Sequence, residues 1–205
     1  MQSDWATCPT PTTGTISLRA SDKTFDYRAI IDRYYPDNNP LQPVYLTHCG
    51  QVARLALDIC RRRSLAVAPA DVEAAAMLHD IGVFLCHAPS IGCTGNEPYI
   101  MHGVLGADLL RREGAPEAYA RVAERHTGSG ISAGEAIRLG LPADRSYIPQ
   151  TELERVVCYA DKFFSKSGDM RQKTFAQVRE SMARFGSDSL ARFDKLAAEF
   201  GPVEP

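Results

Sequence analysis

The feature that most constrains this chain is the stretch Met77–Gly82, which places His79 beside Asp80 where an apolar helix meets a glycine. Neighbouring helical residues point about 100° apart around the helix axis. The imidazole and the carboxylate can therefore share a small ligand only if it lies between them or is dinuclear. A pair of metal ions meets that condition, and the alternative is an ordinary helix end with Gly82 near the C′ position.

The other histidines follow an ordered spacing. The chain has 5 histidines, and all but His87 fall into one series with Asp80 and Asp161. Each gap in the series has the length of roughly one helical hairpin. Gaps of this length, in a chain without strand alternation, predict an all-α fold. The gaps are 31 residues from His48 to His79, 22 from Asp80 to His102, 24 from His102 to His126 and 35 from His126 to Asp161.

In this order the series resembles the HD superfamily of metal-dependent phosphohydrolases, and the His-Asp-Ile-Gly at 79–82 is similar to its HDIG form. The resemblance covers residues 41–167 and implies a single helical bundle around a dinuclear metal site. In the family, the first His, the HD pair and the last Asp hold a metal, the two intervening histidines mark members with two metals, and the HD carboxylate bridges them. The implied ligands are His48, His79, Asp80, His102, His126 and Asp161, with Asp80 also the catalytic residue.

Composition indicates a compact protein. A chain of 205 residues with 44% hydrophobic content can form one domain with a sizeable core. Its 23 basic and 25 acidic residues give a net charge of −2, so no strong binding of nucleic acid is expected.

The 6 cysteines form no CxxC pair and predict reduced thiols in the cytosol. The sequence has no signal-peptide pattern and no apolar run of about 18 residues, which predicts a cytoplasmic protein without a membrane segment.

Periodicity and composition predict three parts. Residues 1–24 are rich in Thr, Ser and Pro and are expected to be a flexible arm, in which Trp5 has no assigned role. Residues 25–167 should form the metal-binding domain. Residues 168–205 should form two amphipathic helices, with Phe185 on one apolar face, that pack on the same domain or on a second subunit of a homo-oligomer. Helices are expected at 26–35, 41–64, 69–78, 99–114, 116–126, 133–140 and from Thr151 through Asp161, with no strand alternation.

Substrate contacts are harder to place. The segment Cys86–Pro98 lies between two ligand positions without a helical period, which is long for a loop in a helical domain. We interpret it as a lid or collar over the substrate, the alternative being an ordinary surface loop. His87, Lys162 and Arg125 are the candidate substrate-binding residues. The plainer interpretation of each is a side chain that faces solvent.

The ligand types indicate the chemistry. Imidazole nitrogens with carboxylate oxygens suit iron, manganese, cobalt, nickel or zinc better than magnesium, and we favour two ions of iron or manganese. Two ions about 3.5–4 Å apart can share Asp80 and a bridging hydroxide, and can neutralise a phosphoryl oxygen. This predicts hydrolysis of a small anionic phosphoester. Val83 stands where HDIG cyclic-dinucleotide phosphodiesterases often carry a lysine, so their substrate is not transferred to this chain.

Two other functions stay open at this point. The same six-residue order is similar to HD-type diiron oxygenases, which act on phosphonates or on polyols such as myo-inositol. The phosphonate enzymes place a Tyr and a Glu before the first His. This chain has no Glu between Asp26 and His48, although it offers Tyr34, Tyr35 and Tyr45. A non-enzymatic metal-binding sensor domain is the other alternative.

Overall fold

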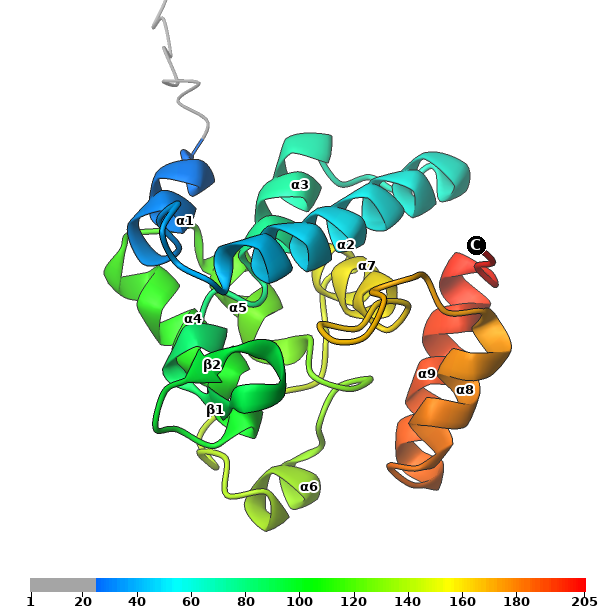
Figure 1. Cartoon of the computed structure of the whole chain (residues 1–205). Coiled ribbons are helices and arrows are strands. Elements are labelled where there is room, and N and C mark those ends of the chain that lie inside the picture. The colour runs from blue at the N-terminus through cyan, green and yellow to red at the C-terminus, as the bar shows by residue number, and fades with distance from the viewer. Residues whose placement is uncertain (1–24) are drawn as a thin grey trace, which may run out of the picture.

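The computed structural model describes residues 25–205, which form an all-α protein with one small β-ribbon (Figure 1). The predictions for residues 1–24, including Trp5, lie outside the described residues. The helices are α1 (Tyr27–Tyr34), α2 (Gln42–Arg63), α3 (Pro69–Leu78), α4 (His102–Arg112), α5 (Glu117–Arg125), α6 (Ala133–Arg138), α7 (Glu152–Asp161), α8 (Phe175–Ala183) and α9 (Ser187–Phe200). The short elements are the 3-10 turns η1 (Val83–Leu85), η2 (Pro89–Ile91) and η3 (Tyr99–Met101) and the strands β1 (His87–Ala88) and β2 (Cys93–Thr94).

The core is built around α2, which packs on α3 and α7 (Figure 1). Val52 and Ile59 of α2 are fully buried, as are Leu78 of α3 and Val157 of α7. Burying one such side chain contributes about 1.5–3 kcal/mol, so this apolar stripe fixes the orientation of α2. His48 lies on the same buried face, as the helical period predicts.

Local signals explain where the central helices begin and end. α3 begins at Pro69, whose fixed φ suits the first helical turn. α2 ends with the basic run 61–63, whose positive charge suits a helix C-terminus, and Ser64 follows in the left-handed conformation with φ 51°. Both helices match their predicted ranges to within one residue.

The segment Cys86–Pro98 is a hydrogen-bonded hairpin, which corrects the expectation that strands are absent. β1 and β2 pair antiparallel. The N–H of Gly95 donates to the carbonyl of Cys86 at 3.0 Å, and a Cβ on Gly95 would overlap with the carbonyl of Leu85. Cys93 is buried in the core. The segment is therefore anchored in its middle as well as at its ends, which fits a fixed collar better than a moving lid.

The C-terminal helices α8 and α9 lie side by side, and α9 packs on α7 (Figure 1). The rings of Tyr159 and Phe193 stack with centroids 5.5 Å apart. The prediction that Phe185 belongs to an apolar face is wrong, because α8 ends at Ala183 and leaves this side chain 68% exposed in the following turn. The predicted domain boundary at residue 168 stays a prediction.

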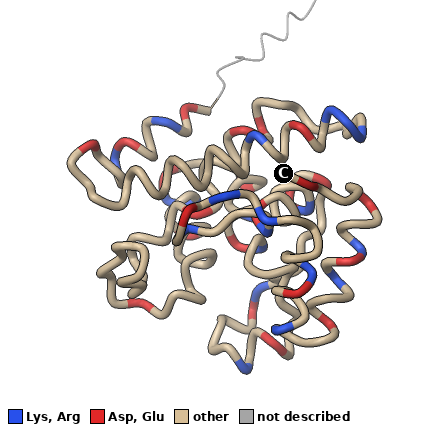
Figure 2. The backbone as a smooth tube through the Cα atoms, turned by 45° about the vertical axis from the view of Figure 1, so that its right-hand side comes forward, with Lys and Arg blue, Asp and Glu red and all other residues tan. Residues whose placement is uncertain are grey.

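Charged side chains are spread over the described part of the chain. Figure 2 shows Lys and Arg interspersed with Asp and Glu along the backbone.

Between residues 25 and 205, no helix combines the length and the apolar character needed to cross a membrane. The cysteines of this part are buried free thiols, and the cytosolic location inferred from the sequence stays a prediction. They are Cys49, Cys60, Cys86, Cys93 and Cys158.

Candidate metal centre

Five helices bring the six predicted ligands to one place in the core. Most of these residues stand at helix ends, where a side chain can turn toward a common centre. All six are buried, and the most exposed of them, Asp161, is only 7% exposed. His48 lies within α2, His79 and Asp80 follow α3, His102 opens α4, His126 follows α5 and Asp161 closes α7.

Five of the six side chains form two groups. In the first group, Nε2 of His48 lies 3.3 Å from Nε2 of His79 and 3.0 Å from Oδ1 of Asp161. In the second group, the Nε2 atoms of His102 and His126 are 3.0 Å apart. Each group thus gathers donor atoms that a single cation could contact.

Asp80 lies between the two groups and turns one oxygen to each. Its Oδ2 is 3.1 Å from Nε2 of His48 and 3.2 Å from Nε2 of His79. Its Oδ1 is 3.3 Å from Nε2 of His126 and 3.5 Å from Nε2 of His102. Both oxygens are buried without a hydrogen bond of acceptable geometry. Such a carboxylate is costly unless cations compensate it. Lys166 supplies one positive charge, 2.7 Å from Oδ2, and the imidazole nitrogens around both oxygens fit a pair of metal ions that share Asp80.

The backbone fixes the orientation of three of the rings. The Nδ1 atoms of His79, His102 and His126 lie 2.6, 2.6 and 2.7 Å from the carbonyl oxygen three residues earlier in the chain. A proton on Nδ1 is donated to that carbonyl. In the neutral ring the lone pair of Nε2 then points into the centre, which is the tautomer that a metal ligand requires.

Burial and charge act differently on the two groups. Burial lowers the pKa of His79, but Asp80, Cys49 and Asp161 together outweigh burial, so that pKa stands well above its usual value. Burial and the neighbouring His126 lower the pKa of His102 to about 3, and burial also lowers the pKa of His126. Burial raises the pKa of Asp80, but His79 and Lys166 outweigh it and hold that pKa well below its usual value. The second group therefore presents neutral imidazoles beside an ionised carboxylate, as metal binding needs.

Gly82 fixes the distance between the motif and α4. Its φ is −85°, so it is not the left-handed C′ glycine of an ordinary helix end. A Cβ at this position would overlap with the backbone nitrogen of Gly106 and the carbonyl oxygen of His102. Glycine is required because α4, which carries His102, approaches the motif backbone this closely.

Two tyrosines hold the motif from the opposite side. The hydroxyl of Tyr45 donates to the carbonyl of Met77 at 2.6 Å, and the hydroxyl of Tyr35 donates to the carbonyl of Ile81 at 3.1 Å. Their rings stack with centroids 4.0 Å apart. These contacts restrain the backbone on both sides of His79 and Asp80.

Two predicted substrate-binding residues lie away from the centre. Nη1 of Arg125 donates to Oε2 of Glu154 at 2.9 Å, and its Nε donates to the carbonyl of Ser146. Glu154 is buried, so this ion pair links α5 to α7 inside the protein. His87 is exposed on β1. Because neither side chain reaches the six-residue cluster, we leave both out of the proposed substrate site.

Two lysines do reach the centre, and the sequence analysis identified one of them. Lys162 lies 2.7 Å from Oδ2 of Asp161 and donates to the carbonyl of His126 at 2.8 Å. Lys166, which the sequence analysis missed, lies 2.7 Å from Oδ2 of Asp80. It stands in the irregular segment after α7, where no motif or helical period marks it. Only the path of the folded chain brings it to the cluster.

A cleft of about 420 Å³ opens beside the centre. Its lining includes Asp161, Lys162 and Lys166, together with Ser90 and Ile91 of the hairpin. This volume is within the range of small-molecule sites. The hairpin therefore borders the space in which a substrate could meet the centre.

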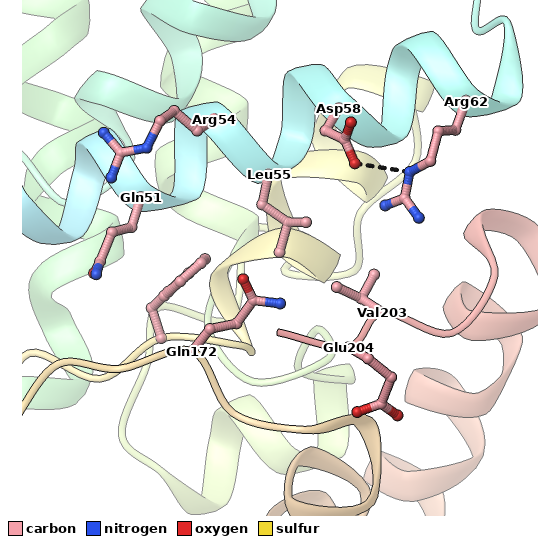
Figure 3. A pocket seen from close by; sticks show the side chains of 9 residues that line it. Gln51, Arg54, Leu55, Asp58, Arg62, Gln172, Val203 and Glu204 are labelled. Carbon is pink, nitrogen blue, oxygen red and sulfur yellow. Dashed lines mark ion pairs between the residues drawn. The ribbon is translucent and has the colours of Figure 1, made fainter.

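A second hollow of about 420 Å³ lies on another face of α2. Its walls include Gln51, Arg54 and the ion pair between Asp58 and Arg62 (Figure 3). None of the six cluster residues lines it. We therefore place the substrate in the first cleft.

Comparison with known proteins assigns the chain to a family. The family model described as the HD domain matches residues 45–165, close to the range of the predicted resemblance. A tRNA (cytidine(56)-2'-O)-methyltransferase of Thermoplasma volcanium is 36% identical over 152 residues, which are 74% of this chain and 40% of that protein. An uncharacterised protein of Methanocaldococcus jannaschii is 38% identical over 117 residues, which are 56% of this chain and 62% of that protein. This chain thus spans less than two thirds of either relative.

Among solved structures, the HD domain of the Listeria monocytogenes phosphodiesterase PgpH matches with a TM-score of 0.49 and 18% identity. The match covers 84% of this chain and 96% of that one, and we infer no activity from it. The match of the family model to most of the bundle, together with the histidine and aspartate series that it contains, shows that this chain belongs to the HD-domain family.

Proposed function

We propose that this protein is a metal-dependent phosphohydrolase that cleaves a small phosphoester with two metal ions. The observation that carries the proposal is that the two oxygens of Asp80 face different groups. Oδ2 lies 3.1 Å from Nε2 of His48, and Oδ1 lies 3.3 Å from Nε2 of His126. A carboxylate that faces two groups of imidazoles supports a dinuclear site rather than a mononuclear one. The proposed ligands are His48, His79, Asp80, His102, His126 and Asp161.

The donor set favours iron or manganese, because imidazole with carboxylate suits these borderline ions. When bound, two such ions lower the pKa of a shared water and stabilise charge on a phosphoryl oxygen. The residues of the chain prepare the site for this chemistry. Backbone carbonyls hold the rings of His79, His102 and His126, and burial keeps bulk water away from the carboxylates.

The proposed substrate is small and anionic. The cleft beside the centre carries Lys162 and Lys166, which supply positive charge for a phosphoryl group. The net charge of −2 and the interspersed surface charges do not favour a long nucleic acid. The name of the Thermoplasma relative, a tRNA methyltransferase, is a reason to include RNA among the substrates tested.

An HD-type diiron oxygenase is the second candidate, since the same ligand set would serve it. The three tyrosines that could support an oxygenase role have their hydroxyls engaged elsewhere. Tyr34 donates to Glu113 at 2.6 Å, and Tyr35 and Tyr45 donate to backbone carbonyls of the motif. This engagement, with the missing Glu upstream of His48, favours the hydrolase.

We expect the protein to turn over without oxygen. Under anaerobic conditions with manganese, it should release phosphate or a phosphomonoester from at least one member of a panel of nucleotides, cyclic dinucleotides, small phosphoesters and RNAs with phosphorylated ends. The physical reason is that activation of water by two ions needs no oxidant. Release of phosphate is the measurement, and the Asp80→Asn protein is the matched control.

Two outcomes would replace this proposal. If the whole panel gives no release, while the iron-loaded protein consumes oxygen with phosphonates or polyols, the oxygenase is the better function. If the protein binds two metals tightly but shows neither activity, the metal-binding sensor is the better function.

Metal affinity should rise with pH. Burial lowers the pKa of His79, but Asp80, Cys49 and Asp161 together raise it well above its usual value, so His79 carries a proton at neutral pH in the metal-free protein. A metal must displace that proton, because a ligand imidazole is neutral. The affinity for Mn²⁺, measured between about pH 6 and pH 8, should therefore increase with pH by up to about tenfold per pH unit, with up to about one proton released.

Calorimetry in buffers of different ionisation enthalpy measures both the affinity and the number of protons released. A constant affinity across this range, with no proton released, would contradict a protonated His79 at the metal site. The His87→Ala protein should show the same pH dependence, because this imidazole is exposed on β1 and is not one of the proposed ligands.

A further inference from the structure

Lys166 makes a contact that the proposed metal site leaves unexplained. Its Nζ lies 2.7 Å from Oδ2 of Asp80 and 5.8 Å from the centre of the Tyr99 ring. The lysine side chain is 16% exposed and Asp80 is 1% exposed, so this is a largely buried ion pair. A lysine is rarely buried unless a specific partner compensates its charge.

The oxygen that Lys166 contacts also faces the first group. Oδ2 of Asp80 lies 3.1 Å from Nε2 of His48 and 3.2 Å from Nε2 of His79. A divalent ion held by these imidazoles would use the same oxygen and would repel the ammonium. Metal and Lys166 are thus competing cations for one carboxylate oxygen.

Lys162 provides a contrast inside the same cleft. It contacts Oδ2 of Asp161, whereas the other oxygen, Oδ1, faces His48 at 3.0 Å. It also donates to the carbonyl of His126 at 2.8 Å. Lys162 therefore keeps both of its contacts when an ion occupies the first group, and Lys166 does not.

A displaced Lys166 has a defined place to go. The residue stands in the irregular segment after α7, and its side chain lines the cleft of about 420 Å³ beside the centre. The flexible four-carbon stem of lysine lets its ammonium move between partners without a change of fold. In the cleft the ammonium would meet the substrate rather than Asp80.

We propose that Lys166 is the counter-ion of Asp80 in the metal-free protein and binds a phosphoryl oxygen of the substrate once metal ions take that carboxylate. The inference rests on the proposed function for the identity of the substrate as a phosphoester. Its physical content is that metal binding releases a cation into the cleft. Metal binding therefore completes the binding site for the phosphoryl group at the same time as it completes the catalytic centre.

Mn²⁺ and inorganic phosphate test this without turnover. By titration calorimetry, Lys166→Met should bind Mn²⁺ about tenfold more tightly than the unsubstituted protein, because no ammonium opposes the ion. The Mn²⁺-loaded variant should bind inorganic phosphate about tenfold more weakly, because a charge-assisted hydrogen bond is lost. Lys166→Arg should retain the phosphate affinity.

Lys173→Met is the matched control. Lys173 lines the same cleft, but its Nζ lies 3.5 Å from the backbone carbonyl of Phe164 rather than beside Asp80. Its substitution should leave the Mn²⁺ affinity unchanged. Lys166→Gln, which removes the charge but keeps a polar side chain, should reproduce the tighter Mn²⁺ binding if Lys166→Met fails to fold.

Two results would overturn the inference. Equal or weaker Mn²⁺ binding by the folded neutral variants would mean that Lys166 positions Asp80 for the metal instead of competing with it. Unchanged phosphate affinity would remove the proposed role in the cleft. Because neither measurement involves hydrolysis, a protein that shows the Mn²⁺ and phosphate effects but cleaves no phosphoester would refute the proposed function while leaving the inference on Lys166 intact.

Discussion

Asp80→Asn should prevent metal binding at both groups of the metal centre, whereas Asp161→Asn should prevent it only at the first group. The expectation follows from the geometry, because Asp80 faces both groups while Oδ1 of Asp161 lies 3.0 Å from Nε2 of His48 in the first group. An amide has almost the same shape as a carboxylate but carries no charge. It therefore removes the electrostatic attraction for two cations without leaving a cavity.

Metal content per chain is the measurement. After dialysis against Mn²⁺ we expect about two ions in the unsubstituted protein, about one in Asp161→Asn and close to none in Asp80→Asn. The affinity of the Asp80→Asn protein should fall by more than about a hundredfold, since the loss of supporting residues alone costs up to that much. Phosphoester turnover should fall by about a thousandfold.

His87→Ala is the control for this series, because it removes an imidazole that the structure places at the surface. It should retain both ions. Two ions in the Asp80→Asn protein would contradict the shared-carboxylate arrangement. Equal metal content in Asp80→Asn and Asp161→Asn would show that Asp80 is not a ligand shared by the two metal ions.

The order and spacing of the histidines, through their resemblance to the HD superfamily, were enough to predict the fold class and the convergence of the cluster. Helical periodicity places His48 on the buried face of α2, and helix ends can be located from single residues such as Pro69. These signals are local, so a sequence carries them directly. The bounds of α3 are the same in the prediction and in the structure.

Features set by tertiary contacts could not be predicted in the same way. Lys166 reaches Asp80 although 86 residues separate them, and no periodic pattern connects the two positions. His87 is close to the motif in sequence, yet the pairing of β1 with β2 leaves its side chain exposed. Nearness along the chain therefore identified Lys162, which stands beside Asp161 and lines the cleft, but it did not identify Lys166.

Gly82 illustrates how one residue can suit two explanations that only packing distinguishes. At the end of a helix, glycine suggests a left-handed cap. The observed φ of −85° is open to any residue, so conformational freedom is not the reason for this glycine. The reason is that α4 occupies the space into which a side chain would extend. The residues of the motif alone do not reveal this contact.

Gly82→Ala should therefore destabilise the protein and weaken the metal site together. The added Cβ would overlap with backbone atoms of Gly106 and His102, which cannot rotate away as a side chain could. Overpacking of this kind costs about 1–3 kcal/mol. In a protein of this size, that cost lowers the midpoint of thermal unfolding by about 2–12 °C.

Gly82→Ala should also weaken metal binding. The added Cβ would force α4 to move, and α4 carries His102 as its first residue. We expect a loss of about tenfold in Mn²⁺ affinity, comparable to other disturbances around metal ligands. Gly50→Ala is the matched control: Gly50 lies in α2 two residues after His48, and its Cβ would meet only the end of the Arg54 side chain at 3.6 Å. This control should be neutral or stabilising by up to about 1 kcal/mol, since alanine favours a helix over glycine. A Gly82→Ala protein that unfolds at the temperature of the unsubstituted protein and keeps its Mn²⁺ affinity would show that α4 can move back without affecting the second group, and that the close approach at Gly82 does not set the position of His102.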